Sequence, residues 1–132
     1  MEIVTGRPPF AWAETVQYSQ SVAAGDLVFT AGQGGFDDDG NVVEGGFEAQ
    51  VRQTFANVAS ALAVHGASLD GIVKLTVYVA DRADYDAFKR VRAELLAPPY
   101  PAGTAVQATL LIDGMLFEMD AVAVRGGVRR AQ

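Results

Sequence analysis

Two stretches of the chain carry apolar residues at intervals of three and four, which is the spacing of one face of an α-helix. The first stretch begins at Phe47, and Gly66 is the glycine expected just beyond the end of its helix. The second lies between a cap at Asp81 or Asp84 and the helix-ending Pro98-Pro99. The two apolar stripes are Phe47, Val51, Phe55, Val58 and Leu62, and Tyr85, Phe88, Val91 and Leu95.

Strand patterns precede the first helix, separate the two helices and follow the second. Runs rich in β-forming residues at 17–22 and 27–31 flank a Gly-Asp turn signal and predict a hairpin. Residues 104–112 and 115–124 predict a final hairpin around Asp113-Gly114. Between the helices, residues 72–79 alternate, and one face of this strand is expected to carry Val73, Leu75, Val77 and Val79.

Three segments lack any period. Residues 1–14 predict an extended N-terminal arm, and residues 32–46, with six glycines and three consecutive aspartates, predict a loop. Residues 125–132 contain three of the arginines and are expected to form a solvated, frayed C-terminal tail. The whole chain, residues 1–132, is interpreted as a single domain.

The element order is therefore β-β-α-β-α-β-β, which predicts an α+β fold with a five-stranded mixed sheet. Two amphipathic helices cover only one face of such a sheet. The strands expected at its centre carry apolar residues on both faces, and an uncovered apolar face is usually buried in an oligomer. We therefore expect a subunit that associates through its sheet.

The composition of the chain excludes several classes of binding partner and site. The formal net charge of −6 opposes binding to nucleic acid and to anionic membrane surfaces. The absence of cysteine excludes disulfides, thiolate catalysis and cysteine-bound metals, and the single histidine, His65, is given no catalytic or metal-binding role. No apolar run approaches the roughly 20 residues of a membrane span. The first residues do not have the pattern of a signal peptide, so a cytoplasmic protein is expected.

Several successive motifs, in order from about Thr15 to Val124, resemble signatures of the RidA (YjgF) family. Two of them frame the predicted first hairpin, one lies in the first helix, and the others follow it. They are Tyr18-Ser19-Gln20-Ser21-Val22, residues 25–33, residues 53–58, residues 66–79, Pro101-Ala102 and Phe117-Glu118.

This resemblance implies a chorismate-mutase-like α+β fold with two helices on one face of a mixed sheet. It also implies a homotrimer whose sheets line a central barrel, with a small-molecule cleft at each subunit boundary. The activity it implies is hydrolysis of reactive enamines and imines to keto acids and ammonia, without a metal or an organic cofactor.

The resemblance also assigns candidate site residues. Glu118 matches the glutamate that orients the attacking water, and Tyr18, Gly32 and Thr104 fall at substrate-binding positions. The family's arginine, whose planar fork binds a carboxylate through two hydrogen bonds, is replaced here by Gly103. Three further positions differ from the family pattern, with Ala31 replacing a serine, Lys89 an asparagine and Arg92 a tyrosine.

Each candidate also has a plain structural interpretation. Glu118 and Asp120 share one face of a strand, where two carboxylates raise one another's pKa or simply form a polar edge. Tyr18 binds substrate or packs across strands. Lys89 and Arg92 are surface charges, unless one of them replaces the missing arginine. Gly103 enlarges the cleft for a bulkier or neutral ligand, or serves a tight turn.

Two functions follow. The first is a divergent RidA-type hydrolase or deaminase for an imine, an enamine or a related intermediate. The second is a non-catalytic ligand-binding or regulatory trimer that has kept the cleft and lost the activity. A Glu118 carboxylate held in a structural ion pair would favour the binding protein. A ribonuclease is disfavoured by the acidic charge and by the lack of a basic aromatic stripe.

Overall fold

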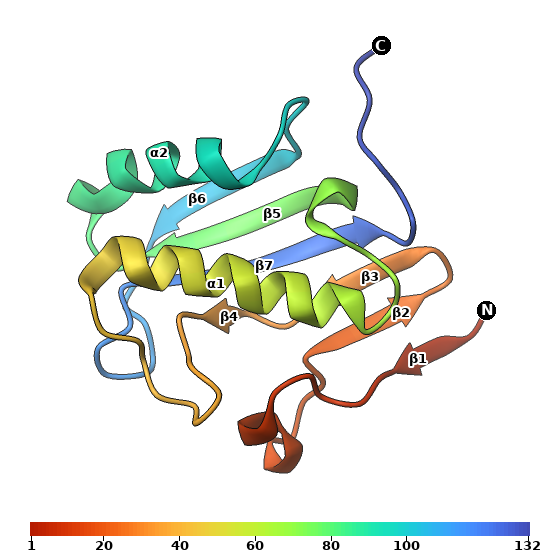
Figure 1. Ribbon diagram of the computed structural model, residues 1–132, viewed down its shortest axis with the longest axis horizontal. Helices are drawn as coiled ribbons and strands as arrows, with labels where there is room; N and C mark the ends of the chain where they lie inside the picture. Colours follow the sequence, from red (N-terminus) through yellow and green to blue (C-terminus); the bar gives the residue numbers. More distant parts are fainter.

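The computed structural model describes residues 1–132 and shows one mixed sheet with two helices on one face (Figure 1). The sheet has seven strands in the order β1-β2-β3-β7-β5-β6, and β4 also pairs with β7. The predicted α+β class, with both helices on one face, is confirmed. The elements are β1 (Ile3–Thr5), β2 (Ser21–Ala24), β3 (Leu27–Thr30), β4 (Gln33–Gly34), α1 (Gly46–Ala63), β5 (Ile72–Val79), α2 (Tyr85–Leu95), β6 (Ala102–Gln107) and β7 (Phe117–Val124).

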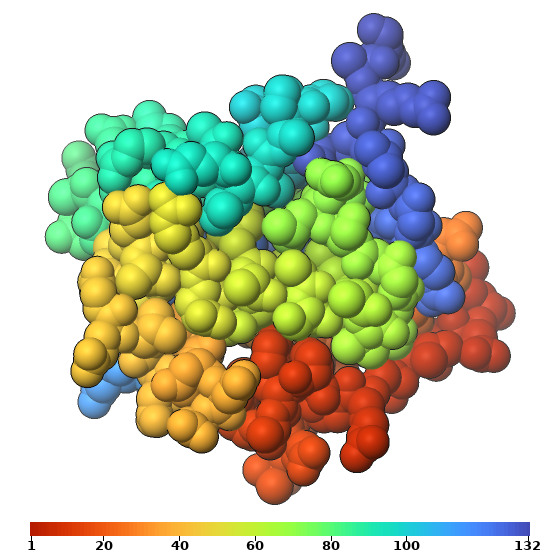
Figure 2. All heavy atoms as spheres, in the orientation of Figure 1, coloured from red at the N-terminus to blue at the C-terminus, as the bar shows by residue number.

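The core lies between the sheet and the two helices. Every member of the predicted α1 stripe is buried, and Gly66, with a φ of 76°, follows the end of this helix. From α2, Phe88 stacks on Phe117 of β7 with 5.2 Å between ring centroids. In Figure 2 the two helices cover this face of the molecule, and the N-terminal segment lies beside the C-terminal end of α1.

The predicted final hairpin is wrong. β6 runs parallel to β5, with Leu75 opposite Gly103, and residues 108–116 form a loop that leads to β7. β7 pairs antiparallel with both β3 and β5 and so lies at the centre of the sheet. The reason is burial. The alternate residues of β7 that face the helices are buried, whereas every residue of β6 is exposed, as suits an edge strand.

The prediction that Val73 shares the buried face of β5 is wrong. Ile72 is fully buried, whereas Val73 is 41% exposed. The pairing of β5 with β7 shifts register between Ile72 and Lys74, which marks a β-bulge. A bulge adds one residue to a strand and exchanges the two faces. Val73 therefore points away from the core, while Leu75, Val77 and Val79 are buried as predicted.

The N-terminal segment has more structure than an extended arm. β1 pairs with β2, and a 3-10 helix at Ala11–Thr15 buries Ala13 against the rest of the protein. β2 begins at Ser21 rather than at residue 17, so Tyr18 precedes the strand. The predicted 32–46 loop also contains β4.

The C-terminal tail is not frayed at Arg129, and the prediction is wrong there. The Arg129 guanidinium donates hydrogen bonds to four backbone carbonyl oxygens. Two belong to the segment before and at the start of β5, and two to the connection between α2 and β6, namely Leu69, Ile72, Ala97 and Pro99. A single side chain thus fastens two segments that are distant in sequence.

The sheet face opposite the helices is uncovered. Phe29, Val73 and Val106 are 42%, 41% and 43% exposed on three different strands. A face of this kind is typical of a surface that associates with another chain. As for membranes, neither helix has the length and apolar character needed to cross one.

Candidate functional site

The predicted site residues fall into two separate hollows. The first, which we call the Glu118 hollow, has a volume of about 520 Å³ and contains Glu118, Tyr18, Ala31 and Gly32. The second, which we call the Arg92 cavity, has a volume of about 380 Å³ and contains Arg92, with Lys89, Gly103 and Thr104. Within one chain the structure therefore brings the predicted residues together only in part.

Glu118 lies on β7, opposite Gly34 of β4 and Tyr78 of β5. Its neighbours Phe117 and Met119 are fully buried against the helices, so Glu118 points to the other face, where it is half-buried. The backbone of Gly32 approaches it so closely that a Cβ there would lie 2.5 Å from Glu118 Oε2. Only glycine fits beside this carboxylate without displacing it.

The Glu118 carboxyl makes no hydrogen bond and no salt bridge within the chain. Burial is the main cause that raises the pKa of Glu118 above its ordinary value, and the nearby Asp120 carboxylate adds to the effect. Asp120 differs because it accepts a hydrogen bond from Tyr78 Oη at 3.0 Å. An unpaired, half-buried carboxyl with a raised pKa is suited to accept and return a proton.

Three segments that are distant in sequence form the walls of the Glu118 hollow. Trp12 comes from the N-terminal 3-10 helix and Phe36 from the loop after β4, with 5.8 Å between their ring centroids. Leu111, Ile112 and Met115 come from the loop before β7. The polar side-chain groups of the hollow are the Glu118 carboxyl, the Tyr18 hydroxyl and the Trp12 indole N–H, and the other lining side chains are apolar.

Two polar side chains of α1 hold these loops in place. Gln50 donates to the Gly114 carbonyl at 2.9 Å and accepts from the Leu116 amide at 2.8 Å. Asn57 donates to the carbonyls of Gly34 and Phe36 at 2.9 and 3.0 Å. Both side chains are buried, so these bonds fix the loops relative to the core.

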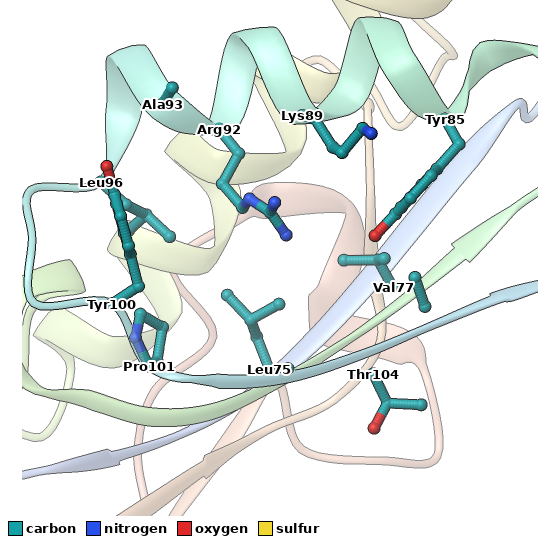
Figure 3. Close-up of a pocket in the computed structure, with 12 residues that line it drawn as sticks. Leu75, Val77, Tyr85, Lys89, Arg92, Ala93, Leu96, Tyr100, Pro101 and Thr104 are labelled. Atoms are coloured by element: carbon teal, nitrogen blue, oxygen red, sulfur yellow. The ribbon is translucent and has the colours of Figure 1, made fainter.

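The Arg92 cavity lies between α2 and the β5–β6 edge of the sheet (Figure 3). Arg92 extends from α2 toward the sheet, with its guanidinium carbon 5.1 Å from the centre of the Phe88 ring. Lys89 forms an ion pair with Asp86 at 3.0 Å and lies 5.3 Å from the centre of the Tyr85 ring. Gly103 contributes backbone alone to the floor of the cavity.

The Thr104 side chain does not enter the Arg92 cavity. In Figure 3 its side chain points away from Arg92, to the other side of β6. There its hydroxyl accepts a hydrogen bond from Lys74 Nζ at 2.5 Å. Thr104 borders the cavity through its backbone, while Tyr85 and Tyr100 supply side-chain hydroxyls.

Several lining residues were not predicted from the sequence. Trp12 lies in a segment without any period. Leu111 and Ile112 were expected to lie in a strand, whereas the structure places them in the loop before β7. Tyr100 lies directly before the Pro101-Ala102 motif, and this position was the one available clue to it. No group of three or more acidic, histidine or cysteine side chains is placed to hold a metal ion.

Comparison with known proteins identifies the family of the chain. A model of the family described as Endoribonuclease L-PSP matches residues 10–125. A RutC family protein of Pyrococcus abyssi is 35% identical over 109 residues, which are 82% of this chain and 86% of the relative. The 2-iminobutanoate/2-iminopropanoate deaminase of Homo sapiens is 30% identical over 115 residues, or 86% of this chain and 84% of the relative.

A solved structure is similar over nearly the full length. The crystal structure of RidA from the Antarctic bacterium Psychrobacter superposes with a TM-score of 0.84 at 34% sequence identity, covering 92% of this chain and 98% of that one. The family match over most of the chain, the sequence relatives and this shared fold agree with one another. The chain belongs to the RidA (YjgF) family, the one described as Endoribonuclease L-PSP.

Proposed function

We propose that the protein hydrolyses an imine or enamine to the corresponding carbonyl compound and ammonia, with Glu118 as the residue that positions and activates water. The observation that carries this proposal is the half-buried Glu118 carboxyl, which has no partner in the chain and a raised pKa. A carboxylate held in an ion pair would have favoured a binding protein. The relative named 2-iminobutanoate/2-iminopropanoate deaminase supports the same chemistry.

The proposed reaction begins with ionised Glu118. Its carboxylate accepts a hydrogen bond from a water molecule, whose oxygen attacks the imine carbon while Glu118 takes the proton. Glu118 then gives this proton to the nitrogen, which forms a carbinolamine. In a second transfer Glu118 takes the proton of the new hydroxyl group and gives it to the nitrogen, so the C–N bond breaks, ammonia leaves and the carbonyl forms. An enamine first tautomerises to the imine. The raised pKa suits both steps, because the same group has to accept and donate near neutral pH. Tyr18 borders the same hollow, and we assign its hydroxyl to substrate binding.

The proposed assembly is a homotrimer in which one subunit's Glu118 hollow faces the Arg92 cavity of the next. Two observations support this arrangement. The sheet face bearing Phe29, Val73 and Val106 is apolar and uncovered, and β6 is an exposed edge strand. The Glu118 hollow contains no cation that could hold a substrate carboxylate, so a second subunit would complete it. Light scattering coupled to size-exclusion chromatography tests this, and a monomer at micromolar concentration would contradict it.

The test of the reaction is ammonia release from freshly generated 2-aminoacrylate and from a cyclic imino acid. We expect Glu118→Gln to lower the rate above background by about 100-fold or more, the usual contribution of general acid–base catalysis. Glu14→Gln, a matched change of an exposed glutamate, should leave the rate unchanged. Equal rates for the wild type and Glu118→Gln would refute the proposal.

A non-catalytic ligand-binding trimer is the second candidate, and Gly103 favours it. The position where the family resemblance expects a carboxylate-binding arginine has no side chain in this protein. Ligand binding without turnover of any imine tested would support this candidate. In either case the ligand is expected to be a small molecule rather than RNA, because a net charge of −6 opposes binding of a polyanion.

A further inference from the structure

The Arg92 cavity is positively charged within an acidic protein. The chain has 16 acidic and 10 basic residues, yet the cavity lining contains Arg92 and Lys89 and no carboxylate. The Lys89 charge is partly offset by its ion pair with Asp86. Arg92 makes no salt bridge, although the two other arginines of the helical layer, Arg52 and Arg90, both bind carboxylates. The one uncompensated cation of α2 is thus the one that enters the cavity.

We propose that Arg92 binds the carboxylate of a ligand in this cavity, and that the ligand carries a ring or a similarly large apolar group. This inference rests on the proposed function, because only that function identifies the ligand as a 2-imino acid substrate. The planar guanidinium group forms two parallel hydrogen bonds with a carboxylate. Its contact with the Phe88 ring fixes the direction of the side chain before any ligand arrives.

The floor of the cavity explains why Arg92 can take this role. Gly103 leaves open the space that a strand side chain would fill, and a Cβ placed there would lie 3.5 Å from Leu75 Cδ1, an ordinary contact. In Figure 3 the Arg92 guanidinium lies above Leu75, in the middle of the cavity. A longer side chain at position 103 would share this space. The arginine on the helix and the glycine on the strand are therefore complementary.

The size and lining of the cavity indicate the rest of the ligand. At about 380 Å³ it falls within the range of pockets that hold drug-sized molecules. Tyr85 and Tyr100 stand at its two ends, and Leu75, Leu96 and Pro101 form apolar surface between them (Figure 3). Aromatic side chains stack on flat rings. A carboxylate with an aromatic or cyclic group fits this lining better than a short-chain acid.

The test measures binding separately from turnover. Phenylpyruvate and 2-oxobutanoate are stable 2-oxo acids that differ in size, and calorimetric titration gives their Kd values. We expect phenylpyruvate to bind the wild type more tightly than 2-oxobutanoate does. Arg92→Gln should weaken phenylpyruvate binding by roughly 10- to 100-fold, the loss expected for charge-assisted hydrogen bonds. Arg90→Gln, a matched change on the outer side of the same helix, should leave the Kd unchanged.

Two further measurements guard against misfolding. Circular dichroism should show that Arg92→Gln retains the helical content of the wild type. The double variant Arg92→Gln, Gly103→Arg moves the guanidinium from the helix to the strand, and we expect it to regain carboxylate binding with a preference for 2-oxobutanoate. Wild-type affinity in Arg92→Gln, or tighter binding of 2-oxobutanoate than of phenylpyruvate by the wild type, would overturn the inference.

The inference and the proposed function can fail separately. Binding that depends on Arg92, without ammonia release from any imine, would support the anion site and refute the hydrolase. Ammonia release that depends on Glu118 but is unchanged in Arg92→Gln would support the hydrolase and refute the assignment of Arg92.

Discussion

The Glu118 hollow and the Arg92 cavity are built from different layers of the molecule and have opposite charge. The Glu118 hollow opens beside the uncovered face of the sheet and holds an unpaired carboxyl in apolar surroundings. The Arg92 cavity lies under a helix and holds an unpaired guanidinium beside tyrosines. Within one chain the two groups lie in separate hollows and form no salt bridge with each other. In the proposed trimer, a ligand between two subunits would separate the carboxyl of one from the guanidinium of the next.

Each hollow contains a glycine, and alanine should be tolerated much less well at Gly32 than at Gly103. In Gly32→Ala the new methyl group would lie 2.5 Å from Glu118 Oε2 and displace the carboxylate. A displacement of about 1 Å can lower an enzymatic rate about 100-fold, and we expect a loss of that order in ammonia release. In Gly103→Ala the new Cβ makes only ordinary contacts. We therefore expect the rate of ammonia release to change by less than about threefold. Equal losses in the two variants would contradict the distinction.

Different side chains hold the segments that line the two hollows, and one variant for each hollow can show that they act independently. Arg129 binds the carbonyls of Ala97 and Pro99, next to the Arg92 cavity, and Gln50 binds the loop that lines the Glu118 hollow. We expect Arg129→Ala and Gln50→Ala each to lower the free energy of unfolding by about 2 kcal/mol. Amide hydrogen exchange should quicken at Leu96, Ala97 and Tyr100 in the first variant and at residues 108–116 in the second. Arg130→Ala is the control, and exchange that quickens in both segments in either variant would show that the supports are shared.

The pH dependence of turnover should reflect the Glu118 hollow alone. Glu118 has to be ionised to activate water, so a raised pKa places the acidic limb of the rate profile above that of an ordinary glutamate. Asp120→Asn removes the neighbouring negative charge. Ionised Glu118 is then more stable, so the acidic limb of the rate profile should move to lower pH. Burial remains the larger cause, so the limb should not fall to the ordinary position. Asp26→Asn, in an exposed turn far from the hollow, should leave the profile in place.

The smallest expected effect concerns stability. Because the pKa of Glu118 is raised in the folded state, folding favours its protonated form, and stability falls as the pH rises through that pKa. Glu118→Gln stays neutral and avoids this loss. The side chain is only half-buried, so we expect a Tm gain of about 1–2 °C at pH 7 and none at pH 4. Scanning calorimetry at the two pH values measures it, and a lower Tm for the variant at pH 7 would contradict the cause given for the pKa shift.

Local patterns in the sequence were enough to predict the helices. Phe47 to Leu62 repeat at helical spacing, and the burial of that stripe depends only on its own periodicity. Strand pairing depends on distant residues, which explains why the local pattern predicts a hairpin of β6 with β7, whereas β6 pairs with β5. The β-bulge at Val73 could not be predicted for the same reason, because it is a shift in the pairing of β5 with the distant strand β7.

The sequence supplied candidate site residues one by one, but not their arrangement in space. The resemblance selected Glu118, Gly32 and Arg92 by position along the chain. It gave no indication that Gly32 is pressed against the Glu118 carboxylate, or that Arg92 is directed into a cavity. Both facts depend on how segments distant in sequence meet in the fold, and no periodicity within a single segment records that.

The central place of β7 also constrains the order in which the sheet forms during synthesis. β1, β2 and β3 form one half of the sheet and β5 with β6 the other, and the only strand that joins them is β7, at residues 117–124. Until that segment has left the ribosome, each half ends in an unpaired strand edge of the kind that promotes misassembly. A nascent chain stalled before residue 117 should therefore depend on chaperones, and release of the eight residues of β7 is the event that removes both edges at once.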